Sequence, residues 1–208
     1  MSVINRIAHF QHRRDEIPNQ ELARDLATQK DHDGIREIAE NLWNKDKHIQ
    51  ADCVKVLYEI GYIDPSLIAD YAEDFLKLLR SRNNRLVWGG MIALSTVAEL
   101  RADLIHANLD EILKLMNTGS VITVDNAVKA LALAASNDAN RESIFPHLME
   151  HLRTCRPKEV PQHAEKSLPA VNAGNKDKFI AVLEKRMEDL SSSQITRVKK
   201  IIKAAASR

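Results

Sequence analysis

Hydrophobic positions recur with helical spacing along most of the chain, and the helical stretches themselves repeat. Between residues 64 and 79, apolar side chains return every three or four positions, as on one face of an α-helix. A fixed interval of 37 residues separates four leucines: Leu57, Leu94, Leu131 and Leu168. Small residues form a second column with the same interval: Cys53, Gly90, Ala127 and Ala164. Together, these columns predict a repeated helical unit.

A further column marks the other half of each unit. Large apolar residues stand 37 apart at Ile38, Phe75, Ile112 and Met149. Each unit is therefore expected to be a helical hairpin, with a first helix richer in small residues and a second helix carrying this column. No single hairpin can bury both of its faces, so the units are expected to stack on one another.

We expect a single domain over residues 1–208, built from stacked repeats between two caps. The complete repeats are placed at 45–80, 81–116, 117–153 and 154–190. Residues 1–44 are expected to form an N-terminal cap with a degenerate repeat, and residues 191–208 a C-terminal capping helix. Caps are expected because the outer face of a terminal repeat would otherwise expose its apolar side chains.

The segment from Phe75 to Leu94 resembles the HEAT-repeat signature. It joins an aliphatic second helix, a short polar link and a first helix that begins with a basic residue and valine and closes in Ala-Leu. Residues 112–131 are a weaker copy, and the resemblance covers residues 33–190. It implies an all-α fold, a right-handed α-α superhelix (solenoid) of about five helical-hairpin repeats of HEAT-like or armadillo type. It also implies a scaffold for macromolecular contacts rather than an enzyme.

Composition and charge narrow the classes of function. Lys and Arg number 30 against 29 Asp and Glu, for a formal net charge of +1, so no bulk charge draws the chain to nucleic acid or to a membrane. Six glycines and six prolines are few for a many-stranded β-protein. The start of the chain lacks a signal-peptide pattern, and nowhere do 18 apolar residues run together. We therefore expect a cytoplasmic protein without a membrane partner or a small-molecule substrate.

Two histidines stand four residues apart and could share a helix face that holds a metal ion. His147 and His151 are followed by Cys155 and His163. The pattern is not H-E-x-x-H, however, and His151 aligns at the 37-residue interval with charged positions expected to be solvated: Glu40, Lys77 and Lys114. We therefore expect no metal site, no cofactor and no catalytic residue.

The cysteine of the small-residue column and the two tryptophans are expected to have structural roles. Cys53 is interpreted as a packed core thiol. Trp43 and Trp88 are expected to pack or to make edge contacts. Their placement does not match HEAT-like alkylpurine DNA glycosylases, where the family pattern implies aromatic side chains around a catalytic aspartate. Glycosylase activity is thus the least favoured of three functional hypotheses.

Acidic residues on the second helices are the basis of the first functional hypothesis. Two columns at the 37-residue interval bring five carboxylates onto this face: Glu37, Asp74 and Glu111 in one, Glu73 and Asp110 in the other. Stacked second helices would present them as an acidic ridge on the concave side. We expect a protein partner to bind there, and we expect Asp74 and Glu111 to be exposed on the same side.

Basic residues at the links and in the last helix support an alternative hypothesis, nucleic-acid binding. The link residues are Lys45, Lys47, Arg80, Arg82, Arg85, Arg153, Arg156 and Lys158, and the last helix adds Arg197, Lys199, Lys200 and Lys203. The link at residues 117–121 contributes no basic residue, so the row is interrupted. Binding to nucleic acid is therefore expected to be weak, blind to sequence and sensitive to salt.

Overall fold

The computed structural model describes residues 2–208, and every regular element in that range is helical. The all-α prediction is therefore confirmed. The chain divides into two compact units, Met1–Arg101 and Ala102–Arg208, named below the N-terminal unit and the C-terminal unit. Each unit is described by itself.

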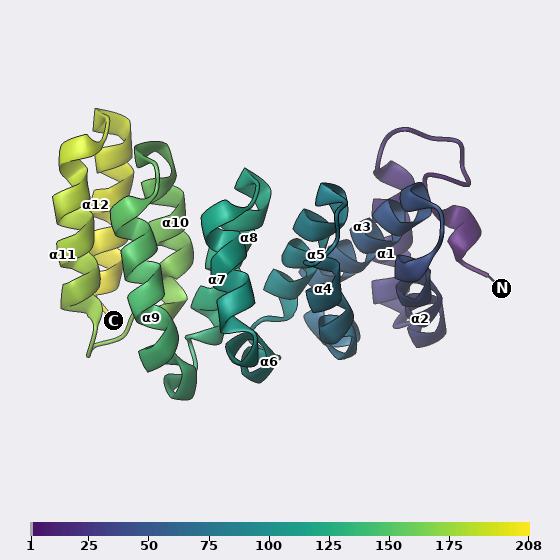
Figure 1. Ribbon diagram of the computed structural model, residues 1–208, viewed down its shortest axis with the longest axis horizontal. Helices are drawn as coiled ribbons and strands as arrows, with labels where there is room; N and C mark the ends of the chain where they lie inside the picture. Colours follow the sequence, from purple (N-terminus) through teal and green to yellow (C-terminus); the bar gives the residue numbers. More distant parts are fainter. Residues whose placement is uncertain (1) are drawn as a thin grey trace. The chain divides into compact units, whose positions relative to one another are not determined.

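The N-terminal unit is a two-layered stack of helices. Its regular elements are η1 (Ile4–Arg6), α1 (Ile17–Gln29), α2 (His32–Glu40), η2 (Asn41–Trp43), α3 (Lys47–Ile63), η3 (Pro65–Leu67), η4 (Ala69–Tyr71), α4 (Ala72–Leu78) and α5 (Asn84–Val97). Helices α1 and α5 pack on either side of α3, while α2 packs on α3 and α4 on α5 (Figure 1). This alternation of first and second helices is the hairpin arrangement that the columns predict.

The C-terminal unit continues the same alternation. Its regular elements are α6 (Ala102–Ala107), α7 (Leu109–Thr118), α8 (Val121–Ala134), α9 (Asp138–Thr154), η5 (Pro157–Glu159), α10 (Val160–Ser167), η6 (Leu168–Ala170), α11 (Lys176–Arg186), η7 (Met187–Asp189) and α12 (Ser192–Ala206). Helix α10 packs between α8 and α12, and α9 packs against α11 (Figure 1).

The leucine column lies in the core, with one partial exception. Leu57, Leu94 and Leu131 are fully buried. Leu168 is only half-buried because α10 ends at Ser167 and Pro169 turns the chain into the short helix η6. The equivalence of the fourth repeat is therefore weaker than the 37-residue interval predicts.

The small-residue column marks places where helices approach closely. A Cβ atom on Gly90 would lie 2.9 Å from the Leu78 Cβ and 3.0 Å from the Phe75 carbonyl oxygen. Both residues belong to α4. Cys53 is fully buried, as expected for a packed thiol. The absence of a side chain at residue 90 thus lets α5 lie directly against α4.

A buried polar network fixes the start of the chain to the first helices. The Asn19 side-chain oxygen accepts a hydrogen bond from the Ala8 amide (2.8 Å), and its NH₂ group donates to Asp52 (3.0 Å). The other Asp52 oxygen accepts the amide of His9 (2.7 Å). Because Asn19 is fully buried and Asp52 nearly so, these bonds satisfy groups that water cannot reach.

Candidate functional site

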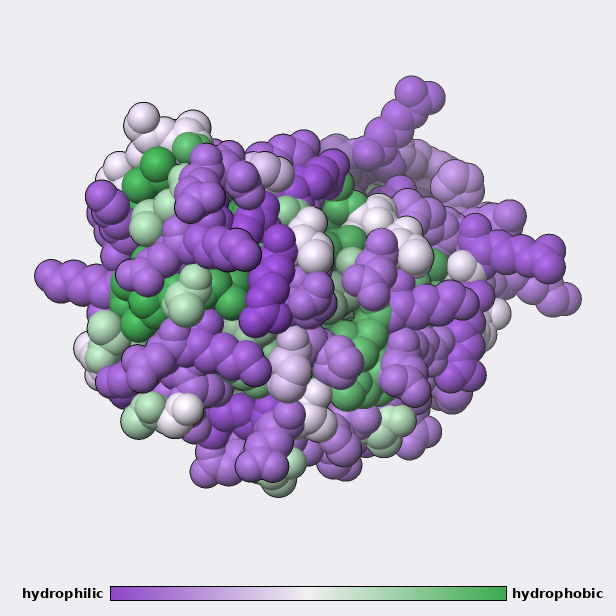
Figure 2. Space-filling model, turned by 60° about the vertical axis from the view of Figure 1, so that its left-hand side comes forward, coloured by the Kyte–Doolittle hydropathy of each residue, from purple (hydrophilic) through white to green (hydrophobic). Residues whose placement is uncertain are grey.

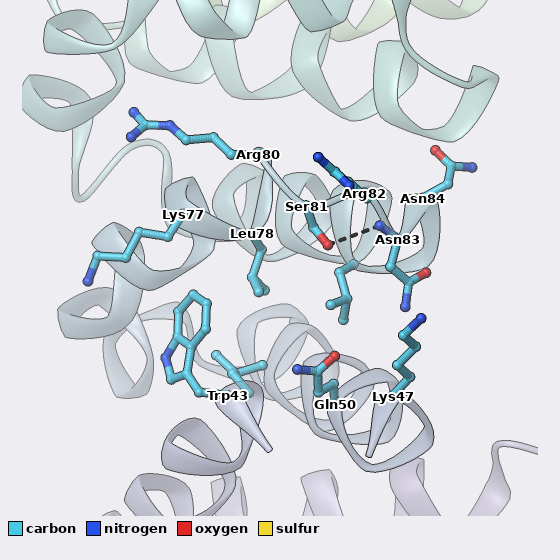
Figure 3. A pocket seen from close by; sticks show the side chains of 12 residues that line it. Trp43, Lys47, Gln50, Lys77, Leu78, Arg80, Ser81, Arg82, Asn83 and Asn84 are labelled. Carbon is cyan, nitrogen blue, oxygen red and sulfur yellow. Dashed lines mark hydrogen bonds between the residues drawn. The ribbon is translucent and has the colours of Figure 1, made fainter. Parts of the chain in front are cut away.

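A groove opens between two links of the N-terminal unit, and we call it the basic groove. Its volume is about 570 Å³. Trp43, Lys47 and Gln50 rise from one side, from η2 and the first turns of α3 (Figure 3). Leu78, Ser81, Asn83 and Leu86 lie opposite, from the end of α4 to the start of α5, and Lys77, Arg80, Arg82 and Asn84 complete the lining.

Helix capping positions both walls of the groove. The Asp46 carboxylate accepts the His48 amide (2.7 Å) and begins α3, and this bond lowers the pKa of Asp46. The Asn83 side chain accepts the Arg85 amide (3.0 Å) and begins α5. The Ser81 hydroxyl in turn accepts the Asn83 amide (3.1 Å; Figure 3). Two helix N-termini, which favour negative charge, therefore border the groove.

The electrostatic character of the groove is positive. Four of its side chains are cationic (Lys47, Lys77, Arg80 and Arg82), and none of the described residues that line it is acidic. Lys77 pairs with Asp74 at 3.0 Å. Lys47 and Arg82 are both exposed, and neither forms an ion pair within residues 2–208. Beside them, the Trp43 indole is 51% exposed, which is high for a large aromatic side chain.

The acidic residues of the N-terminal unit are partly engaged within the unit. Glu37 accepts hydrogen bonds from the Ser2 hydroxyl and from the amides of Val3 (2.8 Å) and Ile4 (3.4 Å). Burial opposes ionisation of this carboxyl, but these donors hold its pKa below the usual value. Asp74 is half-buried beside Lys77, whereas Glu73 is exposed.

In the C-terminal unit, Asp110 is exposed and Glu111 is half-buried. Neither Asp74 nor Glu111 is therefore fully exposed, contrary to the expectation for the ridge, because each lies at the margin of the packed face of its helix. The use of the acidic columns as a binding surface stays a prediction.

The basic residues predicted for nucleic-acid binding divide into paired and unpaired sets. Four arginines contact carboxylates: Arg85 with Glu16 (3.1 Å), Arg153 with Glu150 (3.2 Å), Arg156 with Glu159, and Arg197 with Glu165. Within the described part of the chain, Lys45, Lys158, Lys199, Lys200 and Lys203 are exposed and in no ion pair. Of these predicted residues, Lys47, Arg80 and Arg82 line the basic groove. Arg85 does not line it and is paired with Glu16.

One expectation about solvation is wrong. Glu40, Lys77 and Lys114 are exposed, as predicted, but His151 at the same column position is only 8% exposed. The reason is that α10 packs against α9 and brings His163 to the imidazole of His151, with 2.9 Å between His151 Nε2 and His163 Nδ1. His147, one turn earlier on α9, is exposed and takes no part in this contact.

One face of the molecule is mainly hydrophilic (Figure 2). Figure 2 shows a face on which polar side chains predominate and hydrophobic ones occupy separate areas. The large apolar residues that are exposed are dispersed over the chain: Phe10, Ile17, Trp43, Tyr62, Ile63, Leu100, Val121 and Ile122. None of the described helices is long and apolar enough to cross a membrane.

Sequence reasoning missed the polar part of the groove. Gln50, Ser81, Asn83 and Asn84 each lie near a helix start, and the two asparagines read as ordinary capping or link residues. The signal that could have found them is the clustering of such residues with Arg80 and Arg82 in one link.

Comparisons with solved structures identify the architecture. A designed armadillo repeat protein in complex with the peptide (KR)4 aligns with a TM-score of 0.68 and 17% identity, covering 89% of this chain and 86% of that one. The chain has the HEAT/armadillo-type repeat fold.

Two further structures agree. An engineered protein aligns with a TM-score of 0.65 and 20% identity over 100% of this chain and 98% of that one. A second designed armadillo repeat protein aligns with a TM-score of 0.66 and 16% identity, over 92% and 95% of the two chains. No protein-family model matches the chain, and no curated protein matches its sequence. At these identities the likeness establishes the fold, and function must be argued from the site.

Proposed function

We propose that the protein is a non-enzymatic scaffold that binds an acidic peptide segment of a partner protein in the basic groove. The observation that carries this proposal is the lining itself. Four cationic side chains and an exposed tryptophan line the same groove, and none of the described lining residues is acidic. Lys47 and Arg82 form no ion pair within residues 2–208. They are therefore the groups most available to bind a carboxylate of the ligand.

Each part of the groove matches one part of such a peptide. Arginine offers a planar fork of donors to a carboxylate, and lysine offers a compact charge. The exposed Trp43 ring offers an apolar surface for one aliphatic or aromatic side chain. Gln50 and Asn84 supply amide groups that can pair with extended backbone. Electrostatic attraction would raise the association rate and would select against basic ligands.

Two observations favour a peptide over nucleic acid. Carboxylates within the protein already offset the charge of four of the predicted arginines, so these attract phosphate less strongly: Arg85, Arg153, Arg156 and Arg197. The unpaired cations of the groove are few, whereas affinity for nucleic acid grows with the number of phosphates neutralised. A designed protein of the same fold is described in complex with the peptide (KR)4, which supports peptide binding by this fold, here with the opposite charge.

Fluorescence anisotropy tests the proposal with a labelled peptide in which glutamates flank a single leucine. The matched peptide carries lysine in place of glutamate. We expect the acidic peptide to bind at near-physiological salt and the basic peptide not to bind. The double variant Lys47→Glu/Arg82→Glu should weaken binding about tenfold or more, because it reverses two charges in the groove.

The control is Lys199→Glu/Lys200→Glu on α12, which changes the net charge equally and leaves the groove intact. It should bind the acidic peptide like the unaltered protein. Equal binding by the groove variant would reject the groove as the site. Tighter binding of single-stranded DNA than of the acidic peptide at near-physiological salt would reject the peptide as the ligand class.

A further inference from the structure

Three side chains of the C-terminal unit form a compact histidine–cysteine cluster: His151, Cys155 and His163. One ligand atom from each lies within 4.8 Å of the other two. His151 and Cys155 share one face at the end of α9, where the Cys155 amide donates to the His151 carbonyl (2.8 Å). His163 comes from α10 and meets His151 at 2.9 Å. His151 and His163 are buried and Cys155 is half-buried, so the cluster lies just beneath the surface.

We propose that this cluster is a zinc site, with His151 Nε2, His163 Nδ1 and Cys155 Sγ as the three protein ligands. Zinc binds imidazole nitrogen at about 2.0–2.1 Å and thiolate sulfur at about 2.3 Å, usually with tetrahedral geometry. Two nitrogens on such an ion are about 3.3 Å apart. The two imidazole nitrogens are 2.9 Å apart, a little closer than this value, and Cys155 Sγ lies within 4.8 Å of both. Small side-chain rotations would therefore bring all three atoms to bonding distance of one ion.

A carboxylate orients His163 in the way that metal sites require. His163 Nε2 lies 3.3 Å from Asp125 Oδ1 on α8. A proton held at Nε2 by this carboxylate leaves the lone pair of Nδ1 directed at His151. Histidines that bind metals commonly donate their other ring N–H to such a partner. Asp125 is itself held by Lys166 (2.5 Å) and Gln162 (2.7 Å), so this orientation does not depend on a single contact.

The backbone around Cys155, at the end of α9, is also held in place by hydrogen bonds. The guanidinium of Arg186, on α11, is buried and donates to the carbonyls of Leu152 and Cys155 (2.9 Å for the latter). The last turn of α9 is thereby anchored to a neighbouring helix. The site requires little ordering on binding, since its ligands already lie on packed elements.

Zinc binding changes the protonation of two of the ligands. The Cys155 thiol loses one proton to solvent, and the His151 proton at Nε2 transfers to Nδ1, so both imidazoles stay neutral. The hydrogen bond between the two rings is replaced by two Zn–N bonds. Three protein ligands leave a fourth position to water. A soft thiolate with two imidazoles selects zinc over magnesium or calcium, which prefer oxygen ligands.

The direct test titrates the reduced, metal-free protein with Co²⁺, which reports its ligands optically, and then with Zn²⁺ in competition. We expect one ion per chain, a thiolate-to-cobalt charge-transfer band, and visible bands typical of tetrahedral coordination. Zn²⁺ should abolish these bands. Cys155→Ser should remove the charge-transfer band, and His163→Gln should lower the affinity about a hundredfold or more.

Matched controls come from the same residue types elsewhere in the chain. His147→Gln on the exposed side of α9 and Cys53→Ala in the N-terminal unit should leave Co²⁺ binding unchanged. Asp125→Asn should weaken it about 10- to 100-fold, as expected for a residue that orients a ligand. Loss of Co²⁺ binding in His147→Gln equal to that in His163→Gln would overturn the assignment.

A measurement on the unaltered protein keeps the proposal testable even if the variants misfold. Cys53 is fully buried and Cys155 is only half-buried, so a thiol reagent should reach and modify Cys155 first. Zn²⁺ should slow the alkylation of Cys155, whereas Mg²⁺ should not, with peptide mass spectrometry identifying the modified residue. Alkylation of Cys155 at the same rate with and without Zn²⁺ would reject the site.

Discussion

The two units use the ends of their helices differently. In the N-terminal unit, the link between α4 and α5 leaves Arg82 without an ion-pair partner among the described residues, beside an exposed Trp43. In the C-terminal unit, the two arginines at and just after the end of α9 form local ion pairs, Arg153 with Glu150 and Arg156 with Glu159, and of the predicted link residues there only Lys158 is left without one among the described residues. The same unit instead holds the histidine–cysteine cluster just beneath its surface.

This difference shows how one repeat architecture can host two kinds of site. A shallow groove with unpaired cations favours a ligand that brings its own negative charge. A buried cluster with a fixed carboxylate, such as His163 with Asp125, favours a compact ion instead. In both units the core columns remain, so the site residues vary on a nearly constant scaffold.

The largest expected difference between the units concerns the leucine column. Leu57→Ala should lower the free energy of unfolding by about 2–5 kcal/mol because it opens a cavity in a closed core. Leu168→Ala should cost clearly less, because that side chain is half-buried at the start of η6. Urea denaturation followed by circular dichroism measures both. Equal losses would show that the fourth repeat is packed as tightly as the first.

A smaller difference is expected between two buried asparagines. Asn19→Ala removes the partner of both the Ala8 amide and the Asp52 carboxylate and should cost about 1–3 kcal/mol. Asn140→Ala, in the C-terminal unit, removes one bond to the Ala102 carbonyl and should cost about 1 kcal/mol. Thermal and urea unfolding of the two variants test this order, and the reverse order would contradict the role assigned to the N-terminal network.

The small-residue column has glycine at position 90 in the N-terminal unit and alanine at position 127 in the C-terminal unit, so each residue can be replaced by the other. Gly90→Ala should destabilise the protein by about 1 kcal/mol, because crowding against Leu78 and Phe75 outweighs the better helix propensity of alanine. At the equivalent position of the C-terminal unit, Ala127→Gly should also destabilise, by about 1 kcal/mol, because it loses helix propensity. A Gly90→Ala protein more stable than the original would show that α5 can move away from α4.

The smallest expected effect separates the two tryptophans. Trp43→Ala should change stability by less than about 0.5 kcal/mol, because the ring is mostly exposed. Trp88→Ala should cost more, since that half-buried ring lies against Tyr58 with centroids 6.5 Å apart. If Trp43→Ala leaves stability intact and abolishes binding of the acidic peptide, the groove tryptophan serves binding rather than folding.

Much of the architecture could be predicted from local pattern. Apolar residues three and four positions apart predicted helices, and the 37-residue interval between Leu57, Leu94 and Leu131 predicted that the helices repeat. Helices with one apolar face must then stack. The small residue at position 90 likewise predicted close helix packing, which the distances to Leu78 bear out. These features are readable because each depends on neighbours three to four residues away or on one constant interval.

The candidate sites depend on contacts that no interval predicts. Arg85 is neutralised by Glu16, 69 residues earlier, while Arg82 in the same link keeps its charge free within residues 2–208. His151 aligns with solvated residues of other repeats, yet α10 buries it against His163. Ion pairing and burial are decided by which side chains the packed helices bring within a few ångströms, and a residue's own neighbours in the sequence carry no record of that.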